Sequence, residues 1–115
     1  MSDLKKLMDA VVSFRDERDW KQFHNPKDVA LSLVLEAVEV MEHFQWKTKK
    51  EIDTYLKESK GEVADELADV LYWVLLMSND LDIDIYEAFM KKLKDNNKKY
   101  PIEKAKGKHT KYSKL

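Results

Sequence analysis

The chain has 115 residues, no cysteine and a formal net charge of −1. This length suits one domain with a single core, and the absence of cysteine excludes disulfide bonds and thiolate metal sites. No apolar run approaches the roughly 20 residues of a membrane span, and the N-terminal residues lack the apolar core of a secretion signal. We therefore expect a cytoplasmic protein without a membrane partner.

The predicted elements are all helices, because the chain has only 2 glycines and 2 prolines and little alternation of β-branched residues. Apolar residues at spacings of three and four predict a first helix near residues 3–18. Asn25 as N-cap, with Pro26 at the first helical position, begins a second helix that should run to about Trp46.

Two capping boxes predict the next two helices. The first, at residues 48–51, reads T-x-x-E and begins a short helix through about residue 58. The second, at residues 59–62, reads S-x-x-E and begins a longer helix over residues 60–79.

Asp82 is expected to cap a last helix over residues 83–98, which Tyr100 and Pro101 end. The predicted fold is all-α: a four-helix-bundle-like domain over residues 1–100 with a short extra helix. A flexible basic C-terminal tail follows at residues 101–115.

Charge is distributed unevenly along the chain. Residues 1–90 carry 20 acidic and 11 basic side chains, whereas residues 91–115 carry 10 lysines against two acids. The lysines suit either a solvated tail or an anion-binding end. A nucleic-acid partner is not expected, because the basic residues lie at one terminus beside an acidic body.

Two carboxylate pairs interrupt apolar helices. Glu36 and Glu39 share one narrow polar stripe of the second helix, and Glu66 and Asp69 share a stripe of the helix over residues 60–79. Four carboxylates meeting across a bundle need protons or cations to hold them together. Oxygen ligands without cysteine favour Mg²⁺, with Mn²⁺ or Ca²⁺ as substitutes, whereas ordinary exposed acids would need no metal.

A di-iron centre is the competing metal site. It requires a Glu-x-x-His motif from each of two helices. His43 lies on the same stripe as Glu39 but four residues after it, and the helix over residues 60–79 has no histidine. The sequence therefore gives little support for iron.

Several motifs follow one another in a familiar order. They are "ERDWKQFHNP" at 17–26, E-x-x-E at 36–39, "FQWKT" at 44–48, "DELADVLYW" at 65–73, "KLKDNNKKYP" at 92–101 and a closing "KYSKL". With this combination the chain resembles the MazG-like superfamily of all-α nucleoside triphosphate pyrophosphohydrolases, most closely its dCTP pyrophosphatase branch.

The resemblance implies that the four carboxylates bind Mg²⁺ and carry catalysis. The family reaction cleaves a nucleoside triphosphate between its α- and β-phosphates, which removes unwanted nucleotides from the pool. The metal would polarise phosphoryl oxygens and lower the pKa of a bound water. One of the four acids, or Glu62 or Asp65, would accept the proton of that water.

The resemblance also implies the substrate contacts. Phosphate contacts match Lys92, Asn96, Lys99 and Tyr100, and many relatives have arginine where this chain has Lys99. Aromatic faces can stack on a base. The favoured candidates are Trp20, His24 and Trp46, and the less favoured are Trp73 and Phe23.

The second helix is apolar over more of its surface than a monomer of this size covers easily, which predicts a homo-oligomer. The resemblance points to a homodimer or a homotetramer made of two dimers, in which a tryptophan of one chain can complete a neighbour's base pocket. One departure is "LEAVE" at residues 35–39, where relatives often have "GEVGE".

Two other functions remain open at this point. One is the same metal site acting on dUTP or a modified nucleotide, and the other is a non-enzymatic helical interaction module. The base preference and the number of metal ions are not determined by the sequence.

Overall fold

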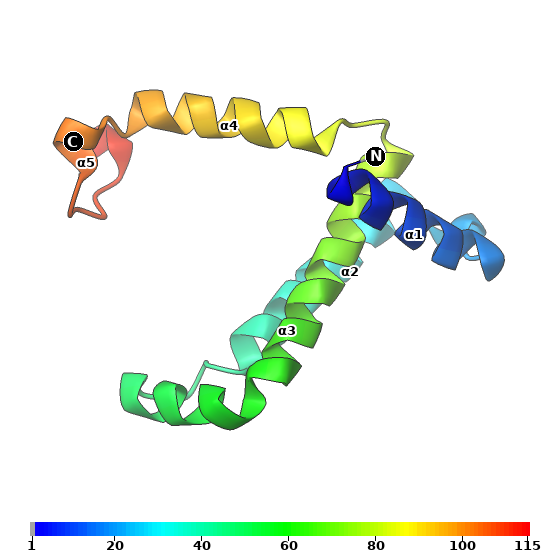
Figure 1. The fold of residues 1–115 in the computed structure, drawn as a ribbon, viewed down its shortest axis with the longest axis horizontal. Helices are drawn as coiled ribbons and strands as arrows, with labels where there is room; N and C mark the ends of the chain where they lie inside the picture. The colour runs from blue at the N-terminus through cyan, green and yellow to red at the C-terminus, as the bar shows by residue number, and fades with distance from the viewer. Residues whose placement is uncertain (1) are drawn as a thin grey trace. The chain divides into compact units, whose positions relative to one another are not determined.

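The computed structural model describes residues 2–115, and all regular structure within them is helical (Figure 1). The elements are α1 (Asp3–Glu17), the 3₁₀ helix η1 (Lys21–Phe23), α2 (Pro26–Glu42), α3 (Lys49–Asp80), α4 (Ile85–Lys99), α5 (Ile102–Ala105) and the 3₁₀ helix η2 (Tyr112–Lys114). The predicted all-α fold class is confirmed. None of the described helices is both long and apolar enough to cross a membrane.

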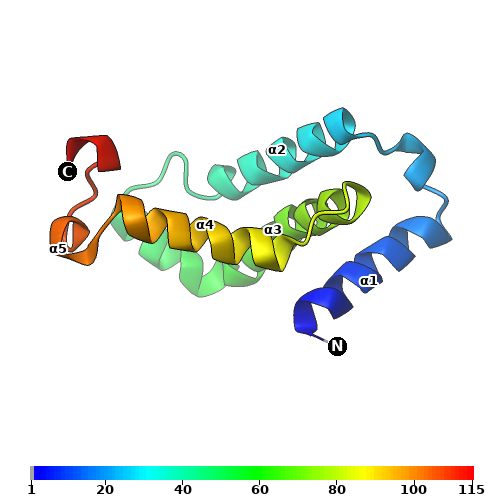
Figure 2. The same ribbon diagram turned by 90° about the horizontal axis from the view of Figure 1, so that it is seen from above.

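The chain forms two compact units. The first ends at Asp82 and contains α1, α2 and α3, whereas the second spans Ile83–Leu115 and contains α4, α5 and η2. In the first unit α2 packs against α3, and the two run antiparallel (Figure 2). This helical hairpin places the two predicted acidic stripes on neighbouring elements.

The start of α2 agrees with the sequence, but its end does not. The Asn25 side chain accepts a hydrogen bond of 2.9 Å from the Asp28 N–H, and Pro26 occupies the first helical position. The helix ends at Glu42 rather than at Trp46. Beyond it the Lys47 N–H bonds to the Phe44 carbonyl, three residues back, so the α-helical hydrogen bonding has already stopped.

The two helices predicted over residues 49–79 are one continuous helix, α3, so the predicted break at Ser59 is wrong. The capping box at Thr48 is present: its hydroxyl accepts from the Glu51 N–H, and the Glu51 carboxylate accepts from the Thr48 N–H. Figure 1 shows α3 bending in its bright green part, around residue 60 on the colour bar; the sequence has Ser59 and Gly61 in this region. Serine and glycine allow a helix to bend there without interrupting its hydrogen bonds.

The cap of α4 is Asp84 rather than the predicted Asp82. The Asp84 side chain accepts a hydrogen bond of 3.1 Å from the Glu87 N–H. Asp82 instead has a φ of 54°, a left-handed conformation in the turn after α3. Tyr100 is the C-cap of α4 and Pro101 follows it, as predicted.

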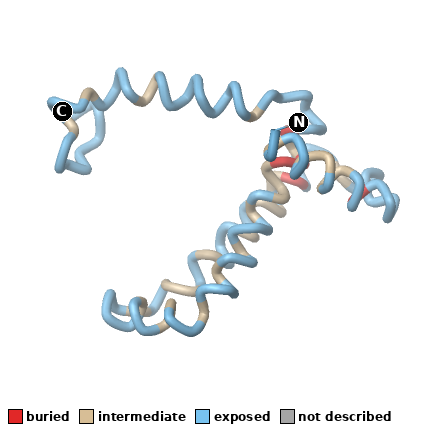
Figure 3. The backbone as a smooth tube through the Cα atoms, in the orientation of Figure 1, coloured by how far each residue is buried: buried red, intermediate tan, exposed pale blue. Residues whose placement is uncertain are grey.

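The most deeply buried residues lie where α1, α2 and the end of α3 meet (Figure 3). Among the described residues they are Arg15, Val29, Leu75, Leu76 and Ser78. The carboxylate pairs on α2 and α3 lie away from this small core, toward the middle of the helical hairpin.

Candidate active site

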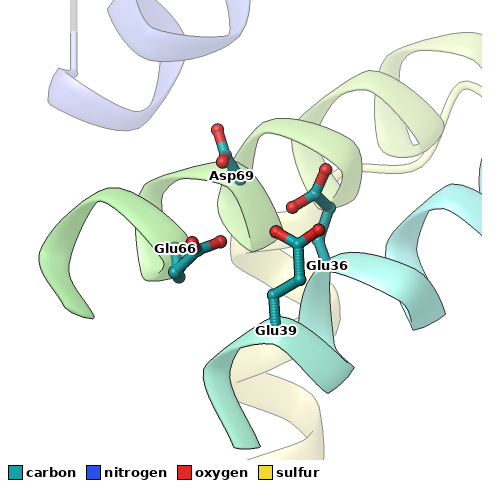
Figure 4. Close-up of side chains that lie close together, drawn as sticks. All are labelled: Glu36, Glu39, Glu66 and Asp69. Carbon is teal, nitrogen blue, oxygen red and sulfur yellow. The ribbon is translucent and has the colours of Figure 1, made fainter. Parts of the chain in front are cut away.

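Glu36 and Glu39 on α2 and Glu66 and Asp69 on α3 lie together between the two helices (Figure 4). Each residue offers one carboxylate oxygen, and these four oxygens are within 4.8 Å of one another. Glu36 and Glu66 are half-buried, whereas Glu39 and Asp69 are exposed. The cluster is therefore open to solvent on one side, where a substrate can reach it.

Glu36 has a buried carboxylate oxygen that no hydrogen-bond donor stabilises. Its Oε2 atom is buried and has no hydrogen-bond partner. Burial raises the pKa of Glu36, and the nearby Glu39 side chain raises it further. A buried carboxylate oxygen without a donor is costly unless a proton or a cation compensates for it.

Glu66 experiences the same crowding. The nearby Glu39 side chain raises the pKa of Glu66, and desolvation and the charge of Asp69 add to this effect. Four oxygen donors in this arrangement fit a hard divalent cation, which would replace the proton. The geometry thus fits a metal ion that these four acids could hold.

A second group of predicted residues forms an aromatic cluster near the end of the same helix. His24, the C-cap of η1, has its ring centroid 5.5 Å from that of Trp73 on α3. Trp73 lies one turn beyond Asp69, so it follows the carboxylates along one face of α3. Burial lowers the pKa of His24, which favours its neutral form.

Trp20 joins this cluster through two residues that the sequence analysis did not select. Its ring centroid is 5.8 Å from that of Phe14, which is 6.1 Å from Tyr72, which in turn is 5.0 Å from Trp73. The Arg18 guanidinium lies 3.8 Å from the centre of the Phe14 ring. Arg18, the C-cap of α1, follows Phe14 by four residues, a spacing that places both side chains on one side of the helix end.

Trp46 lies apart from these aromatic residues. It follows the C-terminal end of α2, the end opposite η1, and its side chain is 86% exposed. Phe23 in η1 is also exposed. Within one chain, the structure brings together Trp20, His24 and Trp73 but not Trp46.

The predicted phosphate contacts all belong to the second unit. Lys92, Asn96 and Lys99 occupy one face of α4, since their spacings are four and three. The Tyr100 N–H donates to the Asn96 carbonyl at 2.8 Å, and the Lys99 ammonium lies 4.9 Å from the centre of the Tyr112 ring. The C-terminal segment thus packs against the end of α4.

Comparison with known proteins identifies the family. The model of the MazG-like family matches residues 31–115, which include all four carboxylates and α4. The chain belongs to the MazG-like family.

Two kinds of relative support this MazG-like assignment. The dCTP pyrophosphatases 1 of Mus musculus and Homo sapiens are each 32% identical over 117 residues, which cover 100% of this chain and 67% of theirs. A crystal structure of a pyrophosphatase from Archaeoglobus fulgidus superposes with a TM-score of 0.82 at 37% identity, covering 88% of this chain and 94% of that one. The predictions of the family and of an enzyme of the pyrophosphohydrolase class are confirmed.

Sequence reasoning missed two side chains beside the carboxylates of this MazG-like chain. The Tyr55 hydroxyl and the His43 Nδ1 form a hydrogen bond, and the His43 Nε2 lies 3.9 Å from a Glu66 oxygen. His43 was visible on the acidic stripe but had been considered only as an iron ligand. Tyr55 gave no signal, because its distance from His43 in space depends on how α2 packs against α3.

Proposed function

We propose that the protein is a Mg²⁺-dependent pyrophosphohydrolase that converts nucleoside triphosphates, most readily dCTP, to the monophosphate and pyrophosphate. The observation that carries this proposal is the cluster of four carboxylates, with oxygens within 4.8 Å of one another, in a MazG-like chain. The similarity to dCTP pyrophosphatases supports dCTP as the first substrate to test.

Glu36, Glu39, Glu66 and Asp69 would hold the cation. When bound, it supplies charge neutralisation for the phosphates and acidifies a water molecule for attack. Glu36 and Glu66 would anchor the site from its half-buried side, whereas the exposed Glu39 and Asp69 would face the triphosphate. One of these acids, or the exposed Glu62 or Asp65, accepts the proton of the attacking water.

The base and the phosphates would be bound by different parts of the chain. Trp73 follows the carboxylates along α3, and it forms an aromatic cluster with His24 and, through Phe14 and Tyr72, with Trp20. These rings could stack on a base, and a neutral His24 can pack against a base without a charge penalty. Lys92, Asn96, Lys99 and Tyr100 would bind the β- and γ-phosphates, with two ammonium groups as the positive charges.

We further propose that the enzyme is a homodimer or a homotetramer. Leu31, Val34, Leu35 and Met41 on α2 and Leu67 on α3 are exposed large apolar residues in the first unit. Such a surface is typical of a subunit interface. The exposed Trp46 would then complete the base pocket of a neighbouring subunit.

The test is product analysis with a panel of deoxy- and ribonucleoside triphosphates, in the presence of Mg²⁺, in EDTA, and with the Glu36→Gln variant. We expect dCTP to give dCMP and pyrophosphate only with Mg²⁺ and intact Glu36. Release of inorganic phosphate, or cleavage in EDTA, would overturn the proposal. Faster cleavage of dUTP or of a modified nucleotide would keep the reaction and change only the substrate.

Membership of the family favours an enzyme over the helical interaction module. In such a module the acidic stripes would be solvent-exposed surface without a bound metal. Burial of the unpartnered Glu36 oxygen argues against this requirement.

A further inference from the structure

Tyr55, His43 and Glu66 form a line of side chains that ends at the carboxylate cluster. The Tyr55 hydroxyl and the His43 Nδ1 form a hydrogen bond, and the His43 Nε2 lies 3.9 Å from the Glu66 Oε1. His43 is the C-cap of α2, whereas Tyr55 and Glu66 belong to α3. The imidazole therefore bridges the two helices that supply the carboxylates.

Lys47, Phe44 and Tyr55 surround His43. The Lys47 ammonium donates to the His43 carbonyl at 2.6 Å and lies 4.2 Å from the centre of the Tyr55 ring. The Phe44 ring packs edge-on against Tyr55, with centroids 6.4 Å apart. Only 13% of the His43 side chain is exposed. The imidazole is therefore largely shielded from water.

The two ring nitrogens of His43 face different groups: Nδ1 faces the Tyr55 hydroxyl and Nε2 faces the Glu66 carboxylate. A proton on Nε2 faces an anionic oxygen, whereas a lone pair there would be repelled by it. With the proton on Nε2, the Tyr55 hydroxyl donates to Nδ1. At 3.9 Å the His43 Nε2 is too far from the Glu66 Oε1 for a direct hydrogen bond, so its effect on that carboxylate is electrostatic.

We propose that His43, oriented by Tyr55, is a positioning residue that holds the Glu66 carboxylate in the direction required of a metal ligand. This inference rests on the proposed function, because it assumes that Glu66 binds the cation. Groups that orient metal ligands typically change metal affinity or activity about 10- to 100-fold when they are removed. His43 does not itself touch the metal or the substrate in this role.

The experiment measures binding of Mn²⁺ alone to the full chain by electron paramagnetic resonance, without nucleotide. We expect His43→Leu to weaken Mn²⁺ binding about 10-fold or more, and Tyr55→Phe to weaken it by a smaller factor. Because Tyr55 acts through His43, the double variant should bind Mn²⁺ as His43→Leu does. His43→Gln keeps an N–H donor and should recover part of the loss.

Two control variants separate orientation from packing. Phe44→Leu removes ring contacts to His43 and Tyr55 but no hydrogen bond, and His109→Leu removes a histidine from the C-terminal tail. Both should keep the Mn²⁺ affinity within about two-fold of the original chain. Additive losses in the double variant, or a loss in Phe44→Leu as large as in His43→Leu, would overturn the proposal.

Activity provides the second measurement. His43→Leu should need more Mg²⁺ for its half-maximal rate, while the rate at saturating Mg²⁺ changes less. If the original chain cleaves no triphosphate but its Mn²⁺ binding follows the expected pattern, the positioning role stands and the proposed function fails. If the original chain binds no Mn²⁺, the positioning role is overturned as well.

Discussion

The Arg15 guanidinium on α1 lies 2.7 and 2.8 Å from the two carboxylate oxygens of Asp80 at the end of α3. The Arg15 side chain is 1% exposed and that of Asp80 is 22% exposed, so this ion pair is largely shielded from water. It connects the helix that precedes Trp20 to the helix that carries Trp73. Its effect on the site is therefore to hold the aromatic cluster together.

Replacing Asp80 by alanine should destabilise the first unit, because the Arg15 charge would remain buried without its main partner. Loss of one partner of a buried pair costs about 3–5 kcal/mol, and the partial exposure of Asp80 places the expected loss at about 3 kcal/mol. Urea unfolding followed by circular dichroism measures this difference in the free energy of unfolding. The control is Asp9→Ala, which removes the exposed Lys5–Asp9 pair and should cost less than about 1 kcal/mol. Equal losses in the two variants would contradict a special role of the buried pair.

Glu36→Gln should stabilise the metal-free protein at pH 7 while abolishing its response to Mg²⁺. The variant removes a carboxylate whose buried oxygen has no partner and which adjoins three other acids. Thermal unfolding with and without Mg²⁺ gives both results in one experiment. Glu42→Gln, an exposed acid of α2 outside the cluster, is the matched control and should leave the Mg²⁺ response unchanged. A Glu36→Gln protein that Mg²⁺ still stabilises would exclude Glu36 as a ligand.

The raised pKa values of Glu36 and Glu66 predict how metal-free stability depends on pH. A group whose pKa is higher in the folded than in the unfolded protein adds stability below its ordinary value, 4.5 for these groups, and this contribution is lost as pH rises through the folded pKa. Metal-free stability from this source should therefore fall as pH rises above about 4.5. Glu51 and Asp95, with lowered pKa values, act in the opposite direction.

The difference in unfolding temperature between the original chain and Glu36→Gln isolates the contribution of Glu36, because Glu51 and Asp95 are present in both. Scanning calorimetry from pH 4 to pH 8 in EDTA measures it. In Mg²⁺ the stabilisation should grow with pH, since protons and the cation compete for the same oxygens. A difference that does not change with pH would contradict the raised pKa of Glu36.

Trp20→Ala should raise the KM for dCTP without changing Mn²⁺ affinity, because the ring belongs to the aromatic cluster and not to the carboxylates. Loss of one stacking contact costs about 1–3 kcal/mol, so an increase of about 10-fold is expected. Initial rates over a range of dCTP concentrations measure it. Phe23→Ala, in the adjacent 3₁₀ helix, is the control and should have a smaller effect. Unchanged KM in Trp20→Ala would remove Trp20 from the base site.

Lys99→Arg should lower the KM for triphosphates by a few-fold, because a guanidinium can bind phosphate oxygens with two parallel hydrogen bonds and an ammonium cannot. Lys99→Ala should raise it. Lys98→Ala is the control, since Lys98 lies off the face that Lys92, Asn96 and Lys99 share. The same steady-state measurements apply. Equal effects of Lys98→Ala and Lys99→Ala would indicate a general field of positive charge rather than a defined contact.

The sequence alone determined the fold class, the family and the identity of the four clustered acids. Helical caps are local, so Asn25 and Thr48 were read correctly from neighbouring residues. The carboxylate pairs were also local, because a three-residue spacing places two side chains on one helical face. The capping pattern at Ser59 is also local, and it gave the wrong prediction of a helix start. Helix continuity depends on hydrogen bonds that a serine does not interrupt.

Only the tertiary structure decided which side chains meet across helices. Arg15 and Asp80 are 65 residues apart in the chain, and neither residue carries a signal of its partner. The contacts of His43 with Tyr55 and Glu66 likewise depend on how α2 lies along α3. Side-chain spacing specifies a helical face, whereas the packing of one helix on another specifies what that face touches.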